Sequence, residues 1–266
     1  MTLAWTTIAT VEGPPSPGPA DFDLPPIFNI AELGVTKPMV LVVLAAVVVV
    51  GGTYAMARPA AVVPGRLQFA GELAYGFVRN SIARDNIGEQ YMKFVPYLFG
   101  VFMFVLLNNF YGVIPFFQFP TMSRIGFPAA IALVTWLIYN IVGMRHHGFL
   151  GYLKHETVPA GVSGPILALL VPLEFISNIL VRPFTLALRL FATMFAGHLL
   201  LILFSLGAEY LFIDYTPTAI GIVAGFFSAL LGIVVSFLDM VIMALQAYVI
   251  TLLSAMYIGE ALADEH

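Results

Sequence analysis

Long runs of apolar residues, separated by short polar segments, dominate the chain. A run of about 18 or more such residues is typical of a membrane-spanning helix, because roughly 20 helical residues cross the ~30 Å hydrocarbon core of a bilayer. Only helices and closed barrels satisfy every backbone polar group in lipid. The pattern predicts an all-α integral membrane protein whose apolar helices cover residues 38–57, 95–114, 126–144, 163–206 and 218–258.

The last two runs are too long for upright helices. A helix over residues 163–206 would measure about 66 Å, roughly twice the hydrocarbon thickness. Pro183 either divides this run into two spanning segments or is accommodated within it, because nearby polar groups can satisfy the carbonyls that a proline frees. We expect the second arrangement, in which residues 163–206 and 218–258 form a long tilted hairpin.

Two polar segments complete the expected organisation. Residues 1–37 are rich in proline and acidic residues and lack the continuous apolar core of a signal peptide, so we expect an exposed tail. Residues 66–92 place Leu67, Ala74 and Ile82 on one stripe at helical spacing. This spacing predicts an amphipathic helix in the plane of the membrane interface, with an ordinary loop helix as the alternative.

The composition excludes several classes of protein. Of the 266 residues, 60% are apolar and 10% are charged, and the mean hydropathy of +0.96 is too high for a soluble domain. The lack of cysteine excludes disulfides, iron–sulfur clusters and thiolate zinc sites. A net charge of −4 without a basic stripe gives no sign of nucleic-acid binding. Without a P-loop, HExxH or GxGxxG motif, we expect a chain that has no cofactor or metal and is not an enzyme by itself.

Basic residues set the expected orientation. One side of the predicted topology carries only Lys37 and Arg124, so the positive-inside rule places the other side in the cytoplasm. The N-terminal tail and the loop at 207–218 then lie outside, and the C-terminus lies inside. The basic residues on the cytoplasmic side are Arg58, Arg66, Arg79, Arg84, Lys93, Arg145 and Lys154.

Arg189 lies in the middle of the apolar run RPFTLALRLFATMFAGHLLLILFSL, in which Arg182 and His198 are the only other ionisable residues. A guanidinium does not lose its proton in proteins, and at bilayer depth it costs at least ~2.5 kcal/mol. In a membrane helix such a residue indicates function. It needs a carboxylate partner on this chain or on another.

Other polar residues of the last two runs also fall on defined faces. At 100° per residue, Arg182, Arg189 and Thr193 lie within about 40° of one another, whereas His198 points to the opposite side. Asp239 and Gln246 are seven residues apart and share a face of the last helix.

The segments PFTLALRLFATMFAGHLL and FLDMVIMALQAYVITLLSAMY together resemble subunit a of the F-type ATP synthase, the stator subunit against which the ring of c subunits turns. The similarity extends from about Arg58 to the C-terminus. It implies that Arg189 meets the c-ring carboxylate and that Gln246 lies opposite Arg189 on the final helix. It also implies that His198 and Asp239 form the acid–base pair of the outer half-channel.

The resemblance further implies a cytoplasmic half-channel that contains Glu174 and Ser177, so that the chain couples proton flow to rotation and ATP synthesis. The implied partners are the c-subunit ring at the Arg189 face, b-type peripheral stalk subunits, the catalytic head indirectly, and the lipid bilayer. The implied location is the bacterial plasma membrane, with the mitochondrial inner membrane as the alternative.

Two positions depart from the family pattern. Thr193 stands where many members have an asparagine, which leaves its role as a channel-lining residue open. The interval from Glu174 to Pro183 is one residue longer than the commonest version, and a π-bulge would absorb the extra residue.

Structural alternatives remain open for most of these residues. His198 and Asp239 would then be a buried polar pair that ties the hairpin together, and Glu174 would be held by Ser177 or Arg182. Asn108 and Asn109 line the outer aqueous cavity or cap a helix end; His146 and His147 are expected to be a solvated loop pair. A small-residue stripe predicts a close helix contact, and its members are Gly221, Gly225, Ala229 and Gly232.

Two other classes of function are weighed against the stator subunit. A proton-coupled secondary transporter would use Arg189 to bind an anionic substrate at the midplane, but such proteins usually contain two repeated halves, which this sequence lacks. A structural scaffold would leave Glu174, Arg189, His198 and Asp239 without a purpose. We expect protons rather than sodium as the transported ion, although the site that selects the ion belongs to the c ring. Ring size and water paths are not encoded in this chain.

Overall fold

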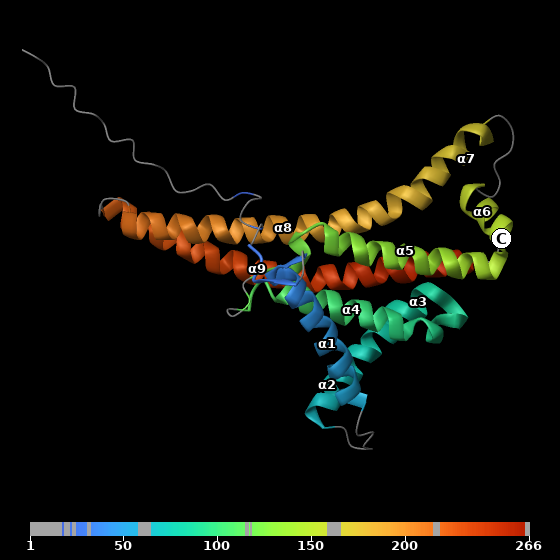
Figure 1. The fold of residues 1–266 in the computed structure, drawn as a ribbon, viewed down its shortest axis with the longest axis horizontal. Helices are drawn as coiled ribbons and strands as arrows, with labels where there is room; N and C mark the ends of the chain where they lie inside the picture. Colours follow the sequence, from blue (N-terminus) through green and yellow to red (C-terminus); the bar gives the residue numbers. More distant parts are fainter. Residues whose placement is uncertain are drawn as a thin grey trace, which may run out of the picture.

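The computed structural model describes residues 18, 22, 25–30, 33–57, 65–114, 117, 119–158, 166–214 and 219–263. This part of the chain is almost entirely helical, which confirms the all-α membrane fold (Figure 1). Within it, four helical stretches are long and apolar enough to cross a membrane, accompanied by the shorter apolar helix α4 (Val95–Phe110). The four stretches are Lys37–Met56, Gly126–His147, Leu169–Ile213 and Ala219–Leu262.

The remaining elements complete the order of the chain. The apolar helices are α1 (Lys37–Ala57), α5 (Gly126–His147), α7 (Leu167–Phe175), α8 (Arg182–Glu209) and α9 (Ala219–Leu262). The π-helices are η2 (Val78–Ala83), η5 (Ile176–Val181) and η6 (Tyr210–Asp214). Short or polar helices are α2 (Arg66–Phe77), α3 (Arg84–Ile87), η3 (Gly88–Lys93), η4 (Thr121–Ser123) and α6 (Phe149–Thr157).

A short β-hairpin lies in the segment for which the sequence predicted only a tail. Strands β1 (Phe28–Ile30) and β2 (Leu33–Val35) pair antiparallel, with Phe28 opposite Val35. Apolar residues alternate along both strands, and this period of two suits a strand rather than a coil.

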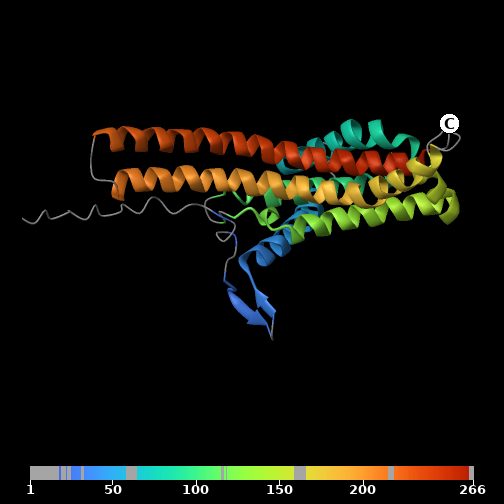
Figure 2. The same cartoon turned by 90° about the horizontal axis from the view of Figure 1, so that it is seen from above.

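The long hairpin of α8 and α9 is the main feature of the fold. α7, η5, α8 and η6 follow one another without a break and contain the apolar stretch Leu169–Ile213 of 45 residues, and α9 has 44 residues. Of the two arrangements considered for Pro183, the continuous one is found. The two helices run side by side, and α4 and α5 cover only one half of them, so the half with the α8–α9 turn projects beyond the rest (Figures 1 and 2).

Side chains of α5 explain why Pro183 does not break the helix. Proline lacks an N–H group, so a carbonyl one turn earlier loses its helical partner. The indole Nε1 of Trp136 donates to the carbonyl of Ile179 at 2.9 Å, and the Tyr139 hydroxyl donates to the carbonyl of Asn178 at 3.2 Å. The backbone groups freed by Pro183 and by the π-helix η5 are therefore satisfied from α5.

Small residues bring α8 and α9 close together at the far half of the hairpin. The Ser228 hydroxyl donates to the Phe204 carbonyl at 3.0 Å. A Cβ atom on Gly225 would lie 3.1 Å from the Phe212 ring, and one on Gly232 would lie 3.4 Å from Phe204. The close helix contact that the small-residue stripe predicted is confirmed.

The expected amphipathic helix over residues 66–92 is divided into α2, η2, α3 and η3. Its buried apolar residues pack in the same core cluster as Ile258 of α9, and they are Val78, Ile82, Ala83 and Ile87. Helix α3 ends at Gly88, whose φ of 77° is a conformation that favours glycine and ends the helix. The segment is therefore helical without a gap from Arg66 to Ile87, and the turn at Gly88 separates its last residues.

Helix α6 was not predicted. It begins directly after α5, at Gly148, whose φ is 75°. The positive φ turns the chain back so that the ring of Tyr152 packs directly on Gly143 of α5, where a Cβ atom would collide with it. α6 thereby comes to lie beside α7 (Figure 1).

Candidate functional site

Arg189 is exposed on the outer side of α8. Its neighbours Leu186 and Leu190 are buried in the core shared with α4 and α9, so the buried stripe of α8 ends beside the arginine. Within the described part of the chain, no acidic side chain forms an ion pair with Arg189. The fold therefore presents this guanidinium outward, where a carboxylate of another chain can reach it.

Thr193 lies one turn after Arg189 and is half-buried. Its hydroxyl donates to the Arg189 carbonyl at 2.8 Å, a bond that is common for threonine within a helix. The Thr193 hydroxyl is thus bonded to the backbone of Arg189.

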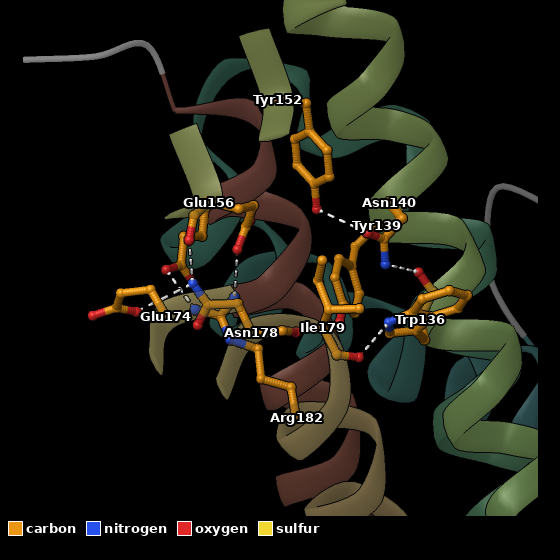
Figure 3. Close-up of polar contacts among 10 residues, drawn as sticks. Trp136, Tyr139, Asn140, Tyr152, Glu156, Glu174, Asn178, Ile179 and Arg182 are labelled. Carbon is orange, nitrogen blue, oxygen red and sulfur yellow. Dashed lines mark hydrogen bonds and ion pairs between the residues drawn. The ribbon is translucent and has the colours of Figure 1, made fainter. Parts of the chain in front are cut away.

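Arg182 was placed on the same stripe as Arg189, but its surroundings differ. Its Nη2 atom lies 2.9 Å from Oε1 of Glu260 on α9, and its Nη1 atom lies 3.9 Å from Oε2 of Glu156 on α6 (Figure 3). Its guanidinium also lies 5.2 Å from the centre of the Tyr257 ring. The chain therefore neutralises Arg182 internally.

His198 and Asp239 lie on the facing helices α8 and α9. Asp239 is 3% exposed, and its carboxylate packs so closely on Gly197 that a Cβ atom there would collide with Oδ1. The carboxylate thus sits beside the sequence neighbour of His198. Neither His198 Nδ1 nor Asp239 Oδ2 has a hydrogen-bond partner, and both atoms are buried.

Gln246 and Asn109 extend this line of polar groups along α9. Gln246 is buried, and its Nε2 atom has no hydrogen-bond partner. Asn109 of α4 donates to the Met243 carbonyl at 3.2 Å, and its Oδ1 atom is also without a partner. A buried polar group without a partner costs about 1–3 kcal/mol, so a run of them marks a site kept for something other than stability.

Asn108 has a different environment from Asn109. Its Oδ1 atom accepts a hydrogen bond of 2.7 Å from Thr121, and its Nδ2 atom donates to the Phe104 carbonyl at 2.8 Å. Both asparagines lie within α4, and neither caps it. Asn108 belongs to a satisfied internal network, whereas Asn109 keeps an unused acceptor beside α9.

Phe22 covers the His198 side of this region, which the sequence did not predict. Its side chain is 4% exposed, and its ring lies 4.8 Å from the Phe195 ring and 5.6 Å from the His198 ring. Arg124 holds it in place, because Nε and Nη2 donate to the Phe22 carbonyl at 3.0 and 2.7 Å.

Glu174 lies in the last turn of α7, just before the π-helix η5, and it is half-buried. Its Oε2 atom accepts from Asn178 Nδ2 at 3.4 Å (Figure 3), rather than from Ser177 or Arg182, the partners of the structural alternative. η5 lies in the interval between Glu174 and Pro183, where the sequence suggested a π-bulge, and this prediction is confirmed. Ser177 lies half-buried within η5.

Glu156 is a buried carboxylate that sequence reasoning missed, with an exposed fraction of 6%. Burial raises the pKa of Glu156 above its usual value of 4.5, and the nearby charge of Arg182 opposes this shift. Tyr152 and Glu156 are four residues apart, a spacing that places two side chains on one face of a helix. This spacing was the available signal for their common environment.

The two histidines after α5 were wrongly expected in a loop. His146 and His147 belong to the last turn of α5, and the His147 ring stacks on His155 of α6 at 5.0 Å between centres. Across the residues described, no group of three or more potential ligands could hold a metal ion.

Comparison with known proteins identifies the family. The chain matches the family model described as ATP synthase A chain over residues 39–259. It is 56% identical over 282 residues to ATP synthase subunit a of a Nocardioides species, with 100% of both chains covered. It is 39% identical over 257 residues to ATP synthase subunit a of Streptomyces lividans, covering 96% of this chain and 90% of that protein.

A third relative extends the same result. ATP synthase subunit a of Rhodococcus erythropolis is 38% identical over 273 residues, with 100% of this chain and 96% of that protein covered. These matches confirm the resemblance noted in the sequence, and they agree with the membrane-spanning helices. The chain therefore belongs to the ATP synthase A chain family, as a bacterial membrane protein and a component of an ATP synthase complex.

Proposed function

We propose that this chain is the proton-conducting stator subunit of an F-type ATP synthase and that Arg189 couples proton flow to rotation of a c-subunit ring. The observation that carries this proposal is the outward position of Arg189, a permanent cation in an apolar helix that has no ion-pair partner within the described part of its own chain. The resemblance to subunit a supports a carboxylate of the c-subunit ring as the missing partner.

The chemistry follows from the cost of charge in lipid. A ring carboxylate crosses lipid only in its neutral, protonated form, because a bare carboxylate there would cost several kcal/mol. When it arrives at Arg189, the fixed positive charge stabilises the deprotonated form and releases the proton. The arginine itself stays protonated, so it blocks a direct proton path between the two sides and forces the ring to turn.

The outer half-channel of this proposal comprises His198, Asp239 and Asn109, and Gln246 is the glutamine expected opposite Arg189. Their unpartnered buried atoms suit groups that exchange protons with a moving water chain. An imidazole titrates near neutral pH and a carboxylate beside it can accept its proton, which makes the pair suitable for proton entry.

The cytoplasmic half-channel comprises Glu174 and Ser177 beside the π-helix η5. On this proposal the N-terminus lies outside and the C-terminus lies in the cytoplasm, as the distribution of basic residues suggests. b-type stalk subunits and the catalytic head are further partners. ATP chemistry belongs to the catalytic head, so the chain itself is not catalytic.

The secondary transporter is the weaker candidate. It would require Arg189 to line a substrate cavity at the midplane between two halves of the molecule. Arg189 instead lies on an exposed face of α8.

The test uses Arg189→Ala in the assembled complex in membrane vesicles. We expect loss of ATP-driven proton pumping by at least about a hundredfold, together with a passive leak or a block of proton flux. Arg84→Ala, on an exposed arginine of α3, is the matched control and should pump normally. Normal pumping by Arg189→Ala would refute the proposed function.

A further inference from the structure

Glu156 lies at the point where α6, α7, α8 and α9 approach one another (Figure 3). Its side chain is buried, although α6 is a short polar helix outside the membrane-spanning stretches. A buried carboxylate is rare unless it is fully paired, so a buried carboxylate with incomplete pairing calls for an explanation.

The charge compensation of Glu156 is incomplete. Arg182 is its cationic neighbour at 3.9 Å, but the same guanidinium makes the closer contact, 2.9 Å, with Glu260. One positive charge therefore serves two carboxylates. The other titratable groups around Glu156 are His155 and Tyr152 on α6 and Tyr139 on α5.

Asn178 connects Glu156 to the proposed half-channel. Its Nδ2 atom donates to the backbone carbonyl of Glu156 at 2.8 Å and to the Glu174 carboxylate at 3.4 Å. The single amide group thus holds α6 against η5, and it lies between Glu156 and Glu174. The Tyr139 hydroxyl holds Asn178 from α5 through its carbonyl.

We infer that Glu156 is a second proton-binding carboxylate of the cytoplasmic half-channel, exchanging protons with Glu174 across Asn178. In the step, the O–H bond of the protonated Glu174 breaks and its proton passes to water in the half-channel. An O–H bond then forms on Glu156 with a proton from that water, so the negative charge passes from Glu156 to Glu174. Glu156 then releases the proton to cytoplasmic water. The shared Arg182 allows both states, because it pairs with Glu260 while Glu156 is neutral. This inference rests on the proposed function of the chain.

Burial supports this role. The raised pKa of Glu156 brings its titration closer to neutral pH, where a proton-exchanging group works best. A carboxylate fully paired to one arginine would instead stay charged.

The test compares Glu156→Gln, Glu156→Asp and Glu89→Gln in the assembled complex in vesicles. Passive proton flux is measured after removal of the catalytic head and is normalised to the amount of assembled complex. We expect Glu156→Gln to slow the flux about fivefold and to weaken its dependence on cytoplasmic pH. Glu156→Asp should retain most of the flux and the pH dependence. Glu89 is an exposed glutamate of η3, so Glu89→Gln should behave as the unaltered chain.

Two results would overturn the inference. The first is an unchanged rate and pH profile in Glu156→Gln. The second is a loss of flux that is as large in Glu156→Asp as in Glu156→Gln, with an unchanged pH profile in both. That second result is the behaviour of a purely structural residue. Failure of the proposed function is distinguished by Arg189→Ala. If that variant stops pumping while Glu156→Gln conducts normally, only the role of Glu156 is wrong.

Discussion

The guanidinium of Arg182 lies 2.9 Å from the carboxylate of Glu260, two residues that are 78 positions apart in the chain. Seven residues later, Arg189 has no such partner within the described part of the chain. The two arginines of α8 therefore differ in their contacts. The first joins α8 to the end of α9 and to α6, and the second lies exposed on α8.

Loss of Arg182 should weaken this end of the fold. Arg182→Ala leaves Glu156 buried without its cation, and we expect the free energy of unfolding to fall by about 1–3 kcal/mol. Chemical denaturation of the purified chain in detergent, followed by circular dichroism, measures the change. A double-mutant cycle with Glu260→Ala should show that the two effects are not additive. Strict additivity would mean that the ion pair contributes nothing to stability.

Gly197 should not tolerate a larger residue. In Gly197→Ala the new Cβ atom collides with the Asp239 carboxylate, so α8 and α9 must separate or Asp239 must turn away. We expect a loss of stability of about 1–3 kcal/mol and a clear loss of passive proton flux. Gly100→Ala is the control, because a Cβ atom there meets no atom within 4 Å. Equal flux in the two variants would contradict the contact between Gly197 and Asp239.

The cover formed by Phe22 can be tested by chemical labelling. The chain has no cysteine, so His198→Cys introduces a unique thiol. We expect a water-soluble maleimide to label it slowly, and about tenfold faster when Arg124→Ala removes the bonds that hold Phe22. A thiol at the exposed Glu209 should react at the same rate in both backgrounds. If His198→Cys also reacts at one rate in both, Phe22 does not restrict access.

Glu156 should make stability depend on pH. Its pKa is raised in the folded chain, so the folded state binds the proton more tightly than the unfolded state does. Stability from this group is therefore fully present below its usual pKa of 4.5 and is lost as the pH rises through the raised value. Glu156→Gln should remove this loss, which denaturation at several pH values above 4.5 will measure. A mutant whose stability falls with pH as steeply as that of the unaltered chain would assign the effect to other groups.

Much of the architecture could be predicted from the sequence, because lipid imposes a simple rule on it. Helices α1, α5, α8 and α9 follow from the length of the apolar runs, since every backbone polar group must be satisfied within the helix. Arg189 stood out for a similar reason, as a charge whose cost must be offset. The π-helix η5 was anticipated from a single extra residue between Glu174 and Pro183.

The remaining contacts depend on the way distant segments meet, which periodicity does not encode. The pairing of Arg182 with Glu260, and the burial of Glu156, require α6 to fold back beside α7 after the turn at Gly148. α6 spans only nine residues, too few for a periodic pattern to identify. The contact of Phe22 with His198 joins the N-terminal region to α8, and nothing in either local sequence indicates it.

The length of α9 has a consequence for the surrounding lipid. A straight helix of its 44 residues, about 66 Å long, fits within a ~30 Å hydrocarbon core only if it inclines by about 60° from the bilayer normal. At that inclination α9 extends about 57 Å within the plane of the bilayer, farther than the ~30 Å it extends across it. The lateral reach of this helix, rather than its height, then sets how broad a face it offers to a neighbouring membrane protein.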